Sequence, residues 1–281
     1  MQRSKMRPIW IFAALLIVVA LVTACQPLLP RPLGGAAPQA AAPAPVGTPT
    51  APLALPDPAQ DWQRIVNKGV LVVGTSASYR PFEYFDDSFQ YAGFDMALLR
   101  AVAEQLGVEV VFRDVAFEGI FDALKLGQID AAVSAISATP DRAQLVDFTD
   151  PYFVSSEGLL AASGSTLGPI DGVEQLAGLR IGVESGSIYA AWLDAGPVAE
   201  GAIDSQNVIR YNSIDAAVAS LADDRVDLII TDLPTAQVYV DSGAAALVGE
   251  GNFLQHYVIA VRQGSAELRD QINQALAVLQ A

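Results

Sequence analysis

The sequence predicts an α/β protein made of two lobes. From about residue 61 to the end, short apolar runs of strand length alternate with longer amphipathic segments, which is typical of parallel α/β sheets. The alternation runs through two successive series, and we expect the last apolar strand, 257–261, to return to the first lobe. The chain would then cross twice between the lobes, and two lobes joined by two strands form a hinge.

The N-terminal 24 residues have the composition of an export signal. Arg3, Lys5 and Arg7 precede an uncharged apolar run, 8–24, that ends in small residues directly before Cys25. This end of the run resembles the lipobox of bacterial lipoproteins. Because Cys25 is the only cysteine, it has no internal disulfide partner, and we expect it to carry lipid. A plain membrane anchor is the alternative, but the run is short for a spanning helix.

A proline-rich segment and an acidic charge balance follow from the composition. Residues 26–60 hold ten of the 17 prolines and much alanine, so we expect 25–60 to form a semi-extended tether. Removal of residues 1–24 leaves 13 basic residues against 31 acidic ones. This balance argues against nucleic acid or an anionic lipid surface as a partner.

The first series of elements begins after the tether. It consists of a strand at 70–74, a helix at 95–106, a strand at 108–112, a helix with Phe117, Ile120, Phe121 and Leu124 on one face, and a strand at 131–134. We expect Asp95 to cap the first of these helices and Gly107 to end it.

The segment after residue 134 holds the most informative residue of the chain, Arg142. Thr139 suits the N-cap of a helix and Pro140 suits its first position, which places Arg142 in the first turn. There it would lie beside free backbone N–H groups and the hydroxyls of Ser134 and Ser137. A guanidinium next to helix-start amides forms a receptor for a carboxylate. The alternative is a solvated surface arginine.

A second series of strands follows residue 153, at 158–161, 179–183, 208–211 and 228–231, with helices between them. The strand at 257–261 and a helix at 265–279 complete the chain. We therefore expect lobe 1 to comprise 61–154 and 257–281, and lobe 2 to comprise 155–256. The sole histidine, His256, would lie near the hinge.

Taken as an ordered set, these segments resemble the bacterial extracellular solute-binding proteins of family 3, the polar amino-acid receptors of ABC importers. The match covers nearly all of 61–281. It is carried by LVVGTSASYRPFEY (71–84), GFDMALLRAVAEQL (93–106), 131–153, GLRIGVESG (178–186) and VDLIITD (226–232).

The resemblance implies a periplasmic-binding-protein-like fold, with two α/β lobes and a hinge of two crossing strands. It implies a receptor that is lipid-anchored outside the cytoplasmic membrane, binds an amino acid between its lobes and delivers it to an ABC permease. We expect a monomer without a cofactor. No His, Cys and carboxylate cluster has metal-ligand spacing, and no glycine-rich phosphate loop occurs.

Four site residues follow from the resemblance by position. Arg142 matches the clamp for the ligand α-carboxylate, and Asp232 matches the partner of the α-ammonium. Tyr79 and Phe117 match aromatic residues that sandwich the ligand side chain. The residues themselves leave other roles open. Asp232 could be nothing more than the cap of the following helix, and the two aromatics could belong to the core.

Two small segments complete the implied site. Ser134, Ala135 and Ser137 match a stretch that offers backbone and hydroxyl groups to the ligand. Ser187 and Ile188 match a turn whose helix-start amides reach the carboxylate from lobe 2.

Three features depart from the family pattern. Ser76 stands where many relatives that select basic or amide side chains have aspartate, which favours an uncharged polar ligand. Glu184 either faces the pocket, where a buried carboxylate favours a basic ligand, or points to solvent. The chain also ends at Ala281, about one helix before such relatives end, so we expect apolar surface to be uncovered near Ile272, Leu276 and Leu279.

Two rival functions belong to other classes. Cyclohexadienyl dehydratases use the same scaffold, but their chemistry needs a general acid. The first carboxylate after the turn at 185–187 is Asp194, so no acid is expected over the ligand and we expect no enzyme activity. An amino-acid sensor is the second rival, although the sequence shows no signalling domain.

Overall fold

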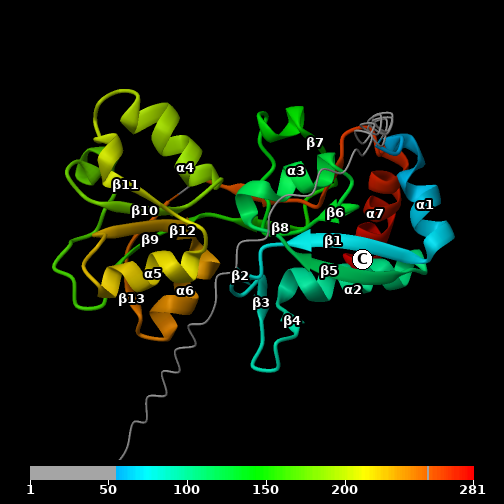
Figure 1. Ribbon diagram of the computed structural model, residues 1–281. Coiled ribbons are helices and arrows are strands. Elements are labelled where there is room, and N and C mark those ends of the chain that lie inside the picture. The colour runs from blue at the N-terminus through cyan, green and yellow to red at the C-terminus, as the bar shows by residue number, and fades with distance from the viewer. Residues whose placement is uncertain (1–54, 252) are drawn as a thin grey trace, which may run out of the picture. The chain divides into compact units, whose positions relative to one another are not determined.

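The structure, a computed structural model, describes residues 55–251 and 253–281, which belong to one compact unit (Figure 1). The predicted signal peptide, Cys25 and the tether up to residue 54 lie outside the described residues. The end of the tether forms a 3-10 turn, η1 (Pro58–Gln60), followed by helix α1 (Asp61–Lys68). In the described part of the chain, none of the helices is both long and apolar enough to span a membrane.

The first lobe is built on a five-stranded sheet. Its strand order is β5 (Glu109–Asp114), β1 (Val70–Thr75), β6 (Ala131–Ala132), β15 (Ala260–Arg262) and β7 (Val146–Phe148). Strand β1 runs parallel to β5 and β6, whereas β15 is antiparallel to β6 and β7. The chain therefore returns to the first sheet after it has built the second one.

Helices cover both faces of this sheet because successive strand residues point to opposite sides. Ala131 and Val261 face α1, α2 (Phe94–Leu106) and α7 (Ala266–Leu279). Their neighbours Ala132 and Ala260 face the short helices η2 (Phe117–Gly119) and α3 (Ile120–Lys125). The first lobe thus has three layers, and its sheet is buried on both sides.

The second lobe repeats this plan with a second five-stranded sheet. Its strand order is β11 (Val208–Tyr211), β10 (Ile181–Glu184), β12 (Leu228–Asp232), β9 (Glu157–Ala162) and β13 (Ala245–Glu250). One face packs against α5 (Ile214–Ala222) and α6 (Leu233–Asp241), and the other against α4 (Ile188–Leu193). Short helical turns complete the lobe at η4 (Val173–Leu176), η5 (Asp194–Val198) and η6 (Ser205–Asn207).

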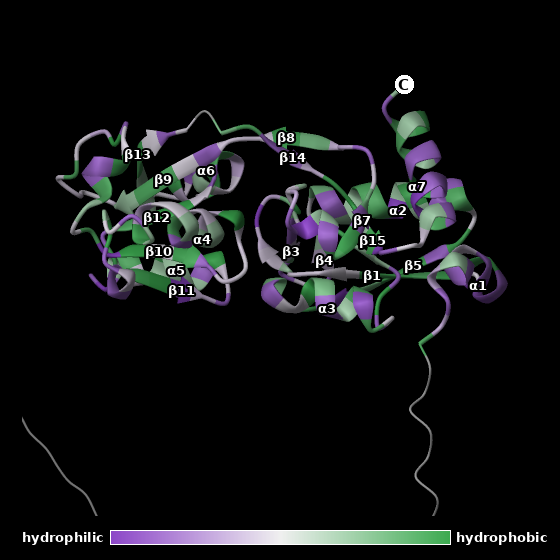
Figure 2. Ribbon diagram, turned by 90° about the horizontal axis from the view of Figure 1, so that it is seen from above, coloured by the Kyte–Doolittle hydropathy of each residue, from purple (hydrophilic) through white to green (hydrophobic). Residues whose placement is uncertain are grey.

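Two strands connect the lobes. β8 (Phe153–Ser155) and β14 (Gln255–Tyr257) pair antiparallel, with Phe153 opposite Tyr257, and they lie side by side between the two sheets (Figure 2). The expected two-lobed fold with two crossing strands is therefore the observed one. The single strand expected at 257–261 is two strands, because Val258 and Ile259 separate β14 from β15. His256 lies exposed on β14.

Both sheets are mixed, so the expectation of parallel sheets was wrong in part. Strand β9 is antiparallel to both β12 and β13, since the chain enters it directly from β8 without a crossover helix. Strands β7 and β13 were not expected. The chain also forms a small antiparallel sheet from β2 (Ser78–Tyr79), β3 (Glu83–Phe85) and β4 (Tyr91–Ala92).

Asp95 does not cap α2, contrary to expectation. The N-cap residue is Gly93, whose φ is 113° and whose missing Cβ would lie 2.2 Å from the Phe82 carbonyl oxygen. The N-cap therefore lies two residues before the expected one, and the helix begins one residue before its expected start. Asp95 lies inside its first turn, fully buried, and its carboxylate turns into the lobe.

Two further expectations need correction. The helix expected after Thr139 is one 3-10 turn, η3 (Arg142–Gln144), because strand β7 begins two residues later; the Thr139 hydroxyl still accepts the Arg142 N–H at 3.2 Å. The apolar residues expected to be uncovered on the last helix are mostly covered. Ile272 and Leu276 are buried against the first-lobe core, and only Leu279 is exposed, at 39%.

Candidate functional site

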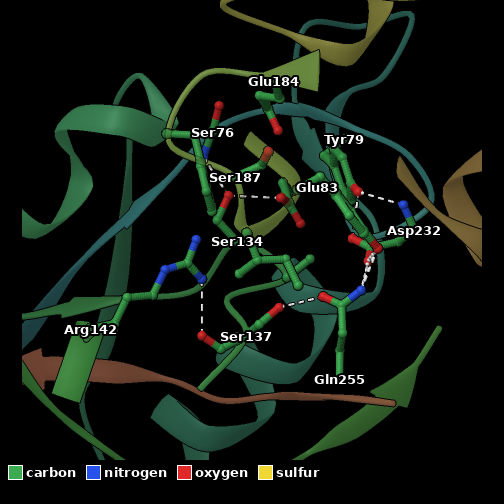
Figure 3. Close-up of a pocket in the computed structure, with 14 residues that line it drawn as sticks. Ser76, Tyr79, Glu83, Ser134, Ser137, Arg142, Glu184, Ser187, Asp232 and Gln255 are labelled. Carbon is green, nitrogen blue, oxygen red and sulfur yellow. Dashed lines mark hydrogen bonds between the residues drawn. The ribbon is translucent and has the colours of Figure 1, made fainter. Parts of the chain in front are cut away.

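One cavity brings together the residues that the sequence singled out (Figure 3). It contains about 360 Å³ of space free of protein atoms, part of it open to solvent. All eleven expected site residues line it, together with three that the sequence reasoning missed. These are Ser76, Tyr79, Phe117, Ser134, Ala135, Ser137, Arg142, Glu184, Ser187, Ile188 and Asp232, with Glu83, Tyr189 and Gln255 as the additions.

Arg142 is the buried cation of this cavity, and only 8% of it is exposed. Its Nη1 donates to the Ser137 carbonyl at 2.9 Å, and its Nη2 donates to the Gly186 carbonyl at 3.0 Å. The guanidinium carbon lies 5.4 Å from the ring centroids of both Phe117 and Phe121. Burial lowers the pKa of Arg142 to about 10, so the group stays charged at neutral pH.

No ion pair in the described part of the chain includes Arg142. A guanidinium carries five N–H donors, and its two hydrogen bonds here go to neutral carbonyl oxygens. A buried charge without a counter-charge is costly. The arrangement is therefore suited to receive an anion from the cavity.

Asp232 is the buried anion of the cavity, at the end of β12. Its Oδ2 accepts the Tyr79 hydroxyl at 2.5 Å, while its Oδ1 accepts the Tyr189 hydroxyl and the Gln255 amide, each at 2.7 Å. Burial raises the pKa of Asp232, and the tyrosine hydroxyls oppose that rise. Its side chain makes no capping hydrogen bond to α6, so the role of a simple helix cap does not hold.

The segment of small residues, 134–137, lies between these charges. The Ser134 hydroxyl donates to Glu83 Oε1 at 2.7 Å and accepts the Ser76 N–H at 3.0 Å. The Ser137 hydroxyl donates to the Gln255 side-chain oxygen at 2.6 Å. Both hydroxyl hydrogens are thus used within the protein, which leaves backbone groups and oxygen lone pairs to face the cavity.

The turn in the second lobe contributes Ser187 and Ile188. Ser187 is the N-cap residue of α4, and its hydroxyl accepts the Ala190 N–H at 3.2 Å. Gly186, with a φ of 76°, aligns its carbonyl with Arg142 across the lobes. A Cβ on Gly186 would lie 2.9 Å from Glu118 Cα, so glycine lets the turn approach the first lobe.

Glu184 faces the cavity instead of solvent and is 7% exposed. In the described part of the chain, its carboxyl receives no hydrogen bond and no ion pair. Burial, followed by the charges of Asp232 and Asp215, raises the pKa of Glu184 to about 8. Ser76 lines the same cavity and is also buried. The cavity therefore holds a carboxyl group that lacks a counter-charge.

Tyr79 and Phe117 both line the cavity, and each also packs in a hydrophobic cluster. The two roles considered from the sequence are therefore compatible. Their rings provide apolar walls, and the Tyr79 hydroxyl also binds Thr231 Oγ1 at 2.9 Å across the lobes.

The three missed residues are polar, but each lies in a segment whose sequence indicates a structural role. Glu83 begins strand β3, Tyr189 lies in the first turn of α4, and Gln255 lies on the crossing strand β14. Of the three, only Gln255 could have been found from the sequence, because a long amide side chain next to a predicted crossing strand would face both lobes.

In the described residues, no group of three or more His, Cys, Asp and Glu side chains is arranged to hold a metal ion.

Comparison with known proteins identifies amino-acid-binding proteins as similar to this chain. The chain is 34% identical to a probable histidine-binding protein of Campylobacter jejuni, over 60% of this chain and 62% of that protein. A solved ancestral arginine-binding protein bound to arginine matches with a TM-score of 0.70 and 33% identity, covering 75% of this chain and 92% of that one. The ancestral amino-acid-binding protein AncCDT-1, a precursor of cyclohexadienyl dehydratase, matches with a TM-score of 0.70 and 28% identity, over 78% and 93%.

The model of a whole protein family also matches, over residues 71–281. Apart from Val70 at the start of β1, that range contains both five-stranded sheets, and it contains the two crossing strands and every residue that lines the cavity. The chain therefore belongs to the bacterial extracellular solute-binding proteins, family 3.

Proposed function

We propose that this protein captures an amino acid between its lobes, outside the cytoplasmic membrane, and delivers it to an ABC importer. The observation that carries the proposal is the buried Arg142 guanidinium, which faces the cavity without a counter-charge. The α-carboxylate of an amino acid supplies that charge and accepts two parallel hydrogen bonds from the guanidinium.

The α-ammonium of the same ligand would bind Asp232. This carboxylate is already satisfied by three donors, so the ammonium would share it with the Tyr79 hydroxyl or displace that hydroxyl. Arg142 comes from the first lobe and Asp232 from the second, so a zwitterion bridges the lobes and favours closure. We take residues 61–154 with 257–281 as one moving body and 155–256 as the other.

The remaining residues of the eleven would serve the ligand from the cavity wall. Backbone groups of the segment 134–137 and of the turn at Ser187 and Ile188 would complete the carboxylate site. Tyr79 and Phe117 would enclose the ligand side chain, with Ser76 and Glu184 beyond them.

Glu184 points to a basic side chain on the ligand. Its carboxyl is buried and has no donor from the described residues, so a cationic group would remove the cost of ionising it. Relatives named for arginine and histidine agree with a basic ligand. We therefore propose a basic amino acid, with L-arginine first, in preference to an acidic one.

The anchor and the transporter complete the proposal. The signal sequence and Cys25 would tether the folded part to the membrane through a lipid, with 26–60 as the spacer. Closure would present both lobes to a permease, and the receptor would act as a monomer.

The carboxyl groups in the cavity bear on the dehydratase alternative. The sequence reasoning excluded it because no carboxyl follows the turn at Ser187, but the structure brings Glu83 and Glu184 into the cavity. Because its pKa is raised to about 8, the Glu184 carboxyl is protonated at neutral pH, as a general acid must be. The relatives compared above are named as binding proteins, which favours binding. Prephenate turnover by the purified protein would instead support the enzyme.

A thermal-shift panel of the twenty amino acids tests the proposed function. A ligand that binds the native state raises the melting temperature, so we expect a shift with arginine and smaller or no shifts with glutamate and aspartate. Arg142→Met should abolish the shift. Arg225→Ala is the matched control, because Arg225 is exposed and its ion pair among the described residues is with exposed Asp223. No shift with any amino acid would refute the function.

A further inference from the structure

Two acidic side chains are buried close to each other at the cavity wall. Glu83, at the start of β3, is 1% exposed, and Asp95, in the first turn of α2, is 0% exposed. The two carboxyls accept hydrogen bonds from consecutive residues, Ser134 and Ala135, so they lie close together. No ion pair in the described part of the chain includes either of them. Two ionised carboxylates buried this close together would repel each other strongly.

Their hydrogen-bond pattern requires a proton. Glu83 Oε1 accepts the Ser134 hydroxyl at 2.7 Å, and Asp95 Oδ2 accepts the Ala135 N–H at 2.9 Å and the Tyr152 hydroxyl at 2.8 Å. Each carboxyl then has one buried oxygen, Glu83 Oε2 and Asp95 Oδ1, that no N–H or hydroxyl group reaches. One proton between the two side chains satisfies both, with Glu83 as donor and Asp95 as acceptor.

The surroundings favour that assignment. Burial and the Asp95 charge raise the pKa of Glu83 well above its usual range, and the charge of Glu184 adds to the rise. Asp95 receives two donors, the Ala135 N–H and the Tyr152 hydroxyl, which stabilise its ionised form and oppose the increase in pKa that burial causes. Tyr152, whose hydroxyl donates to Asp95, is the other titratable group that contacts the pair among the described residues, and it supplies no positive charge.

The pair holds the part of the cavity wall on which the proposed function depends. Asp95 fixes the amide of Ala135, a non-glycine residue with a φ of 43°, and Glu83 fixes the hydroxyl of Ser134. A residue held at positive φ is strained, so it needs such a restraint. Tyr152 extends the network to the crossing strands, because its N–H donates to the Tyr257 carbonyl at 2.9 Å.

We propose that Glu83 and Asp95 share one proton at neutral pH and act as positioning residues that hold the segment 134–137 in its binding conformation. The positioning role rests on the proposed function, whereas the shared proton does not. In this role, neither carboxyl has to form an ion pair with the ligand.

Infrared spectroscopy of the protein without ligand tests the proton. The background is Glu184→Gln, which removes the other carboxyl whose pKa is strongly raised in the cavity. At pH 7 we expect the carbonyl band of a buried protonated carboxyl, and we expect Glu83→Gln to remove it, since the amide donates to Asp95 without a titratable proton. A spectrum without the band, or one that Glu83→Gln leaves unchanged, overturns the shared proton.

Two substitutions at Glu83 test the positioning. Glu83→Gln keeps both hydrogen bonds, so the Kd for L-arginine should stay within about threefold of wild type. Glu83→Leu leaves Asp95 and Ser134 without a partner and should weaken binding about tenfold or more. In the same proteins, exchange of the Ala135 amide hydrogen should be faster in Glu83→Leu only. Equal affinities and equal exchange in the two variants would overturn the role.

Tyr152→Phe provides a second probe if Glu83→Leu does not fold. It removes one donor from Asp95 and should speed Ala135 exchange while the infrared band remains; unchanged exchange counts against the role. If wild type binds no amino acid in the thermal-shift panel, the proposed function fails, while the infrared band and Ala135 exchange still decide whether the pair holds a proton and the segment.

Discussion

A basic ligand should bind more tightly as the pH rises from 6 to 8, because it requires Glu184 to be ionised. The pKa of Glu184 is raised from 4.5 to about 8, mainly by burial. If only the ionised form accepts the ligand, the apparent Kd exceeds its limiting value by about 100-fold at pH 6, about tenfold at pH 7 and about twofold at pH 8. Arginine keeps its side-chain and α-ammonium charges over this range, so the protein dominates the change.

Calorimetric titration with L-arginine at pH 6, 7 and 8 measures this dependence. Glu184→Gln is the matched variant, since it keeps the size of the side chain but cannot ionise. We expect its arginine affinity to be weaker at pH 8 and nearly independent of pH. Equal pH slopes in wild type and Glu184→Gln, or tightest binding of glutamate to wild type, would refute the assignment of Glu184 to the ligand side chain.

The same pKa shift predicts an opposite trend for the stability of the unliganded fold. A carboxyl whose pKa is raised on folding binds its proton more tightly in the native state, so stability is greatest below pH 4.5 and falls as the pH rises towards about 8. The loss is on the order of a few kcal/mol at most. Denaturant unfolding at pH 5 and pH 9 should show Glu184→Gln gaining on wild type at the higher pH; a constant difference would contradict this.

The other predictions concern the clamp, the core and the anchor. Arg142→Met and Asp232→Asn should each weaken amino-acid binding by about 30-fold or more, because loss of one partner of a desolvated charge pair costs about 2–5 kcal/mol, and wild-type titrations would contradict this. Asp61→Asn should destabilise the fold by roughly 3 kcal/mol in denaturant unfolding, since the buried Asp61 carboxylate holds Arg262 at 2.7 Å. The pKa of Asp61 is lowered from 3.8 despite its burial, so this difference should shrink as the pH falls below about 4; a constant difference would count against the pair. Cys25→Ser should move the protein from the membrane fraction to the soluble one, and normal processing with membrane retention would exclude the lipid anchor.

Much of the fold could be predicted because its signals are local. The apolar runs at 70–74 and 228–231 are buried strands, and their hydrophobicity needs no tertiary context to be recognised. Strand β13 escaped prediction because its residues are small, with a bulge between Leu247 and Gly249, so no alternation is visible. Strand β7 has only three residues, and its place is set by pairing with the distant β15.

The site residues also divide into those that have a local sequence signal and those whose role depends on tertiary contacts. Arg142 could be found from the polar residues and capping signals around it, although the expected helix is a single 3-10 turn. Asp95 was misassigned because an aspartate near a helix start is typical of a cap, while the close approach of Gly93 to Phe82 moves the N-cap by two residues. The role proposed for Glu83 depends on the Asp95 carboxyl from another element, and only the folded chain brings both to the consecutive residues Ser134 and Ala135.

Calorimetric titration of the wild-type protein with L-arginine and with agmatine, its decarboxylated analogue, tests the central claim most directly. Agmatine keeps the guanidinium that Glu184 would bind but lacks the α-carboxylate that Arg142 would bind. We predict one-to-one binding of L-arginine and an affinity for agmatine that is at least about 30-fold weaker. Equal affinity for the two compounds would show that Arg142 does not receive the α-carboxylate, and would contradict the account.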